Sequence, residues 1–278
     1  MPAWEVLSYT GSAGSVTSFG TQSPVGSDPA SVRYFSNGQA KFLNVFAQSD
    51  AAGEGRIFAN DWHDTTNGIR FNIRSINQTQ TGTGSTGLSG GTVSDLLLDD
   101  EFYQPLNSQA SLTIQASGSS TGLGLINWYS SLDGITQKLT SPDALRGHIL
   151  NRKTLVIPVA SGFGYSTTST AFNAFDTTLH GNTYYAVAGY GVGRADCLTV
   201  GLKGNFTGNL HLGGPGTSFM PWVTRNIFVR LSRLTGMPMV PYFNSADQAN
   251  CFVEIANSGG ISVAPIISLN LLETDFTS

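Results

Sequence analysis

The stretch Leu112-Thr-Ile-Gln-Ala-Ser-Gly118 returns 141 residues later as Val253-Glu-Ile-Ala-Asn-Ser-Gly259. Both copies alternate apolar and polar residues and end in a Ser-Gly turn, which is typical of a β-strand with one buried face. The spacing is that of a whole domain, because solenoid repeats have periods of roughly 20–50 residues. The pair of segments therefore predicts that the second half of the chain is a diverged copy of the first.

Two further matches occur in the same order along the chain. Asn37-Gly38-Gln-Ala-Lys-Phe42 resembles His180-Gly181-Asn-Thr-Tyr-Tyr185 at an offset of 143, and Val6-Leu7-Ser-Tyr9 resembles Val156-Ile157-Pro-Val159 at an offset of 150. Small loop insertions produce such a drift. Turn glycines and strand ends are fixed by backbone geometry, so they persist when side chains diverge. We expect the halves to superpose with these neighbours: Val6 and Val156, Gly38 and Gly181, Ile114 and Ile255, Gly118 and Gly259.

Short apolar or alternating runs separated by Gly, Asn, Ser and Pro predict an all-β sandwich or barrel. Asn226–Leu231 is one of the expected strands. The best helical signal is Ser141–Asn151, where Ser141 is a plausible N-cap and Pro142 occupies the first helical position. The predicted organisation is a first β domain over 1–134, a linker with a short helix over 135–153, and a second β domain over 154–278.

Composition favours a protein with large contact surfaces. Only 12% of the 278 residues are charged, about half the usual share, while 40% are hydrophobic and the net charge is −4. Surfaces rich in hydroxyl and amide groups suit extensive packing, because burying Ser or Thr costs less than burying Lys or Glu. No basic run is present, so we expect no sequence-specific nucleic acid partner.

The residues that could carry chemistry form no complete constellation. Trp62-His63-Asp64 places a histidine beside a carboxylate without a nucleophile nearby in sequence. Asp99-Asp100-Glu101 is the densest acidic group and could hold a divalent cation, so a metal site stays open. Gly213-Gly-Pro-Gly216 is interpreted as a turn, because Pro215 removes an amide donor that a phosphate cradle would need. The sequence thus predicts no catalytic residue, no cofactor and no enzymatic activity.

Three other segments carry specific expectations. Cys197 and Cys251 are expected to stay thiols, because the start of the chain lacks the features of a signal peptide. The Gly-, Ser- and Thr-rich stretch Asn77–Thr92 is expected to be a surface loop. Phe228–Ser245 is interpreted as a strand followed by an apolar segment bracketed by Pro238 and Pro241. That segment either contacts a neighbouring protein or closes the domain core.

Tandem antiparallel β domains, a linker helix, few charges and long polar loops together resemble the double jelly-roll major capsid proteins of tailless icosahedral bacteriophages. The resemblance implies two tandem jelly rolls and a structural virion protein, made in the host cytoplasm. Three copies would form a pseudo-hexagonal trimer that tiles an icosahedral shell and meets other virion proteins, such as penton or internal membrane proteins.

Two alternatives remain open. One is a phage receptor-binding or carbohydrate-binding β-sandwich, for which Trp62, Trp128 and Trp222 are the candidate exposed aromatic residues. The other is a hydrolase on a β scaffold, against which the scarcity of acidic residues beside histidine argues.

Overall fold

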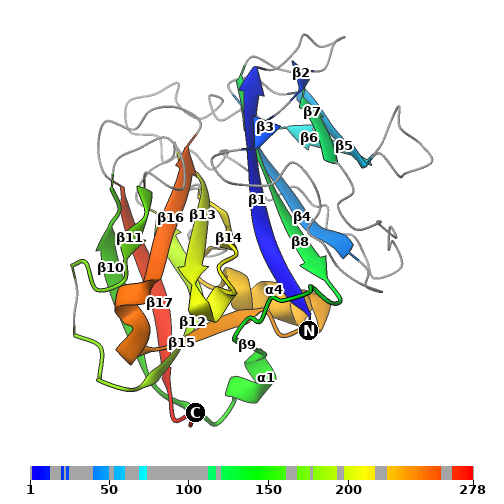
Figure 1. Ribbon diagram of the computed structural model, residues 1–278. Coiled ribbons are helices and arrows are strands. Elements are labelled where there is room, and N and C mark those ends of the chain that lie inside the picture. The colour runs from blue at the N-terminus through cyan, green and yellow to red at the C-terminus, as the bar shows by residue number, and fades with distance from the viewer. Residues whose placement is uncertain are drawn as a thin grey trace.

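The computed structural model describes residues 2–12, 20–21, 23–24, 40–49, 53–59, 69–73, 112–116, 120–160, 168–175, 178–192, 197–216, 224–257 and 265–277. These residues form an all-β protein, as the sequence predicts. Their strands lie in four sheets, and every described strand pair is antiparallel (Figure 1). None of the described helices is long and apolar enough to cross a membrane.

The strands of the second half pair as one long hairpin folded in two. In chain order they are β10 (Ile149–Pro158), β11 (Thr170–Ala171), β12 (Tyr184–Val192), β13 (Cys197–Gly204), β14 (Leu212–Pro215), β15 (Val240–Asn244), β16 (Cys251–Asn257) and β17 (Ile266–Thr274). The pairs are nested, from β10 with β17 outermost, through β11 with β16 and β12 with β15, to β13 with β14. The resulting sheet orders are β10-β17-β12-β15, extended by the short β9 (Leu139–Thr140), and β11-β16-β13-β14.

The first half repeats this order. Its strands are β1 (Ala3–Ser12), β2 (Gly20–Thr21), β3 (Ser23–Pro24), β4 (Ala40–Ser49), β5 (Gly53–Ala59), β6 (Ile69–Ile73), β7 (Leu112–Ala116) and β8 (Ser120–Tyr129). One sheet has the order β3-β1-β8-β4. Its strands β1, β8 and β4 correspond to β10, β17 and β12 in the second half. The other has the order β2-β7-β5-β6, which corresponds to β11-β16-β13-β14. A counterpart of β15 would fall in residues 74–111, which lie outside the described residues.

A bulge recurs at the same place in both halves. The β4–β8 pairing shifts between Phe42 and Asn44, and the β12–β17 pairing shifts between Val187 and Gly189. Aligning the halves at this bulge brings Val6 level with Thr154, two residues from the expected Val156 and on the same face of the strand. Ile114 and Ile255 each lie in the central strand pair of their sheets, while Gly38, Gly118 and Gly259 lie outside the described residues.

Of the helix that the sequence predicts over Ser141–Asn151, only the first part is helical, because residues 149–151 already belong to strand β10. Helix α1 (Pro142–Leu145) begins after Ser141, whose hydroxyl accepts a hydrogen bond from the Ala144 amide at 3.1 Å. Pro142 occupies the first turn, and Gly147, with φ of 87°, follows the helix. Both α1 and the first residues of β10 fall in the predicted linker, whose boundaries stay predictions.

The prediction of a strand at Asn226–Leu231 is wrong. These residues belong to helix α4 (Ile227–Thr235) and its N-cap, and Gly236, with φ of 68°, ends the helix. Ile227, Phe228 and Leu231 are buried on one face, whereas Arg230 and Arg233 are exposed. Burial at positions i, i+1 and i+4 is the spacing of a helix. In a short apolar run, the sequence pattern alone does not distinguish a helix from a strand.

The Pro-bracketed segment contributes to the core. Met239 and Val240 are fully buried, and Phe243 packs against Phe172 and Tyr185 in the aromatic core. Pro241 lies in β15, at the point where pairing with β12 gives way to pairing with β9. Of the two interpretations, closure of the domain core therefore agrees with the structure.

Both cysteines are buried and form no disulfide, as predicted. Burial and, to a smaller extent, the charge of Asp247 together raise the pKa of the Cys251 thiol to about 12. The Cys251 thiol is therefore protonated at neutral pH.

Asn127 in β8 is a buried side chain whose amide oxygen and nitrogen both lack a hydrogen-bond partner. At the equivalent position beside the bulge, β17 has the buried Leu271. We expect Asn127→Leu to raise the free energy of unfolding by about 1–3 kcal/mol, because it removes the desolvation penalty of an unpaired amide. Denaturant unfolding measures this, with Leu271→Asn as the reverse control that should lower stability. A less stable Asn127→Leu protein would contradict the assignment.

Candidate functional site

The most distinctive polar arrangement in the described residues is the seam where β1 of the first half lies against β13 and β14 of the second (Figure 1). The Val6 amide donates a hydrogen bond to the His211 carbonyl at 2.8 Å. The buried hydroxyls of Ser8 and Thr199 share a hydrogen bond of 2.7 Å. Buried polar groups paired across the seam fix the register between the two halves, because slippage would leave them unpaired.

Trp4 carries the apolar part of the seam. It is fully buried within the hydrophobic core of the second half, and its ring lies 5.7 Å from that of Phe228 on α4. Gln137, which lies between β8 and β9, receives a hydrogen bond from the Trp4 amide at 3.0 Å and donates to the Trp4 carbonyl at 2.8 Å. The same Gln137 amide donates to the Thr207 carbonyl at 3.1 Å. The Gln137 side chain thus ties β1 to the second half.

The Gly213-Gly-Pro-Gly216 run, predicted to be a turn, forms most of β14 instead. A side chain has no room there. A Cβ on Gly213 would lie 1.7 Å from the Val200 carbonyl oxygen, and one on Gly214 would lie 2.6 Å from Ile227 of α4. The run is therefore a close-packed strand next to β1, where glycine permits the backbone to approach its neighbours.

A buried ion pair lies beside the seam. Nε2 of His211 is 2.5 Å from Oε2 of Glu254, and both side chains are only 6% exposed. Burial raises the pKa of Glu254. The hydrogen bond and charge of His211, a hydrogen bond from Ser169 and the charge of Lys203 lower it by more, so the net pKa lies below its ordinary value of 4.5. The carboxylate is therefore held ionised, and the His211 backbone in turn holds β1.

The lowered pKa of Glu254 predicts a loss of stability in acid. A depressed folded-state pKa stabilises the protein above the unfolded value of 4.5 and loses this contribution as the pH falls through the folded value. Relative to Glu254→Gln, the wild-type protein should lose about 1–2 kcal/mol of unfolding free energy as the pH falls from about 5 to about 3, because one group contributes at most about 1.4 kcal/mol per pH unit. Denaturant unfolding across this range measures the difference. Asp143→Asn, which alters only an exposed pair with Arg146, should keep the wild-type profile.

The structure places two further histidines, His148 and His180, beside carboxylates as well. Nδ1 of His148 is 2.8 Å from Asp275, and Nδ1 of His180 is 2.8 Å from Glu273. The sequence suggested few acidic residues beside histidine, so the fold makes pairs that the linear chain does not show. Glu273 lies near the end of β17, and Asp275 directly follows that strand. Each pair therefore ties this end of the sheet to a neighbouring segment.

The other residues that the sequence suggested as candidates for a site fall into two groups. Trp62, His63, Asp64, Asn77–Thr92, Asp99, Asp100, Glu101 and Trp222 lie outside the described residues. Trp128 is half-buried and packs against the core. Within the described ranges no group of three or more His, Cys, Asp or Glu side chains is arranged to hold a metal ion.

Known proteins that resemble this chain identify no family for it. No protein-family model matches the chain, and no curated protein matches it. Among solved structures, the crystal structure of PBSX exported protein XepA is similar over 97% of this chain and 86% of that chain, with 10% sequence identity and a TM-score of 0.23. A TM-score of this size does not establish a shared fold.

Proposed function

We propose that this protein is a structural virion protein, a major capsid protein in which each half is a jelly roll. The observation that supports it best is the same nested strand order in both halves, including the bulge. Eight strands in two sheets that pair as a folded hairpin are the pattern of a jelly roll, a fold found in viral capsid domains. The nested strand pairs of the second half, and the matching pairs among the described residues of the first half, support this assignment.

The seam favours a protein whose two halves act as one block, as a shell requires, over a protein whose two domains move independently. Trp4, the Ser8–Thr199 hydrogen bond and Gln137 fix the first half against the second. A chain whose two similar units form one block supplies six similar units from three copies, and closed rotational symmetry is the usual basis of assembly. In this proposal the partners are further copies of the chain and then other virion proteins, the location is the virion, and there is no enzymatic activity.

The test is the assembly state of the purified protein. Light scattering should report a trimer or a larger shell, and negative-stain electron microscopy should show hexagonal outlines. A stable monomer at high concentration would contradict the proposal. Leu150 on the outer strand β10 is 63% exposed, so Leu150→Asp should weaken association. The neighbouring Asn151→Asp, which adds the same charge at an exposed polar position, is the matched control.

One observation favours carbohydrate binding as a second candidate. A pocket of about 440 Å³ is lined by Tyr184, Tyr242 and Phe276 together with Lys138, His148 and Asp275. Tyr242 contacts both other rings in edge-on geometry. Aromatic faces beside polar groups suit a sugar ring. Binding on a glycan array that is lost in Tyr242→Ala, by a protein that stays monomeric, would favour this function over the capsid role.

A further inference from the structure

One face of β1 is covered by the second half of the chain, whereas the same face of its counterpart β10 is uncovered. The side chains of Trp4, Val6 and Ser8 share this face of β1 and are fully buried at the seam. With the two halves aligned at the bulge, their counterparts on β10 are Arg152, Thr154 and Val156. These three counterparts are exposed or half-buried, so equivalent positions in the two halves differ in what covers them.

The neighbouring strand β17 shows the same contrast. Ile126 of β8 is 1% exposed, and a Cβ on Gly214 of β14 would lie 3.8 Å from its Cδ1 atom. Its counterpart on β17 is Asn270, which is only half-buried. Ile266, on the same face of β17, is 52% exposed. A sheet face that exposes a large apolar side chain in one half and is packed in the other is a candidate contact surface.

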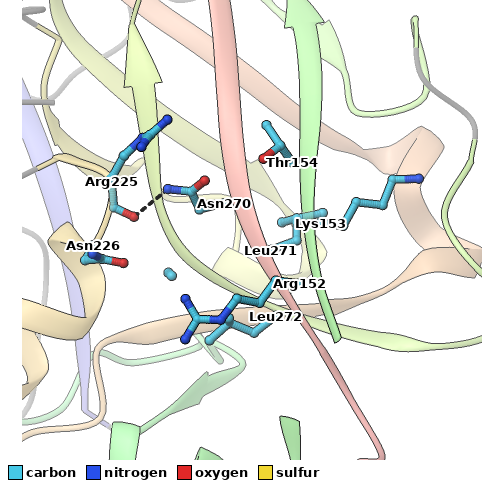
Figure 2. Close-up of a pocket in the computed structure, with 9 residues that line it drawn as sticks. Arg152, Lys153, Thr154, Arg225, Asn226, Asn270, Leu271 and Leu272 are labelled. Carbon is cyan, nitrogen blue, oxygen red and sulfur yellow. Dashed lines mark hydrogen bonds between the residues drawn. The ribbon is translucent and has the colours of Figure 1, made fainter. Parts of the chain in front are cut away.

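The uncovered face is also hollowed. A second pocket, of about 340 Å³, is lined by Thr154 and Asn270 and by Arg225 from the segment that precedes α4 (Figure 2). Thr154 and Asn270 are the counterparts of Val6 and Ile126, which belong to the hydrophobic core at the seam. The hollow therefore takes the place of the packed contact that the same positions make in the first half.

The seam shows what kind of structure fits this face. β1 contacts β13 and β14 of the second half, and the counterparts of these two strands in the first half are β5 and β6. Strands β5 and β6 lie on the opposite side of the molecule from β10 (Figure 1). One chain therefore cannot bring the two surfaces together, but two copies of the chain can.

We propose that the uncovered face of β10 and β17 binds the β5–β6 strand pair of a second copy of this chain. This contact repeats, between copies, the seam that joins the two halves within one copy. It joins two different surfaces, and such head-to-tail contacts close into a ring when the rotation between neighbours allows it. The inference rests on the proposed capsid role and specifies which surfaces join the copies. The contact is more polar than the seam, as in interfaces between subunits that fold before they associate.

The repeat also predicts which residues meet across this contact. At the seam, the hydroxyls of Ser8 and Thr199 are 2.7 Å apart. Val156 is the counterpart of Ser8. Arg56 is the counterpart of Thr199 when β7 and β16 are aligned on their repeated sequence segments. Val156 of one copy should therefore lie beside Arg56 of the next.

Cross-linking of introduced cysteines in the full-length protein tests this neighbourhood. Both native cysteines are buried, so a short bis-maleimide reaches the introduced thiols. We expect the Val156→Cys/Arg56→Cys double variant to give covalent dimers and trimers on a denaturing gel, and each single variant to stay monomeric there. Circular dichroism checks that each variant is folded. Gln115→Cys, directly opposite Arg56 on β7, replaces Arg56→Cys if that variant does not fold.

A charge on the uncovered face should weaken association. Ile266→Asp should raise the dissociation constant by about tenfold or more, because the contact would bury an unpaired carboxylate. Phe175→Asp is the matched control, since Phe175 is 68% exposed but follows β11 of the other sheet. It should leave the dissociation constant within about twofold. Sedimentation over a series of protein concentrations measures both.

The outcomes separate this contact from the capsid role. Association of the wild-type protein without cross-linking of the double variant, or equal effects of Ile266→Asp and Phe175→Asp, would overturn the contact and leave the capsid role standing. Cross-linking of Val156→Cys alone would mean that two β10 faces meet each other, which also overturns it. A wild-type protein that stays monomeric at high concentration would overturn both proposals.

Discussion

Trp4→Ala is expected to lower the free energy of unfolding by about 3–5 kcal/mol, the usual cost of removing a fully buried aromatic side chain. The Trp4 ring is completely buried and packs against Phe228. Trp4 belongs to β1 of the first half and Phe228 to α4 of the second half. The cavity left by the missing ring therefore weakens the contact between the halves as well as the hydrophobic core. Chemical denaturation followed by circular dichroism measures the loss. Hydrogen exchange should also accelerate in the neighbouring strands β13 and β14.

Phe175→Ala is the control for this substitution. Phe175 is also a large aromatic residue but is 68% exposed, so its removal should change stability by no more than about 0.5 kcal/mol. If Trp4→Ala cost as little as Phe175→Ala, the seam would not be a packed interface, and the two halves would not form one block.

The features that the sequence predicts correctly are set by local chemistry. The Ser141 cap and Pro142 at the start of α1 act within one turn of the chain, and the alternating run Leu112–Ala116 forms strand β7. The repeated segments point to a repeated strand order because turns and strand ends resist divergence. The residue-level match of Val6 with Val156 is displaced by two positions, since a strand can slide by two residues and keep the same face buried.

The features that the sequence does not predict depend on distant packing. Gly213-Gly-Pro-Gly216 has the composition of a turn, and only its close contacts with Val200 and Ile227 make it a strand. For α4 a local signal exists, because Gly236 follows the apolar run at the position of a helix C-cap. The seam itself joins residues far apart in sequence, such as Ser8 and Thr199, so neither partner identifies the other.

Gly213→Ala is expected to cost about 3 kcal/mol, at the upper end of the usual range for forcing an added methyl group into a packed interior. The added Cβ would lie 1.7 Å from the Val200 carbonyl oxygen and 2.7 Å from its carbonyl carbon. These atoms are backbone in β13, so relief requires β13 and β14 to separate, and the contacts of β14 with β1 would weaken with them.

Gly181→Ala is the matched control for Gly213→Ala. A Cβ on Gly181 would meet nothing within 4 Å, so this substitution should shift stability by less than about 1 kcal/mol and can even increase it by reducing the freedom of the unfolded chain. Denaturant unfolding of both variants measures the contrast. Equal stability of the two would mean that β14 is not pressed against β13 as the structure describes. A large loss confined to Gly213→Ala, together with weakened assembly, would show that the glycine-rich strand supports the block from which the proposed shell is built.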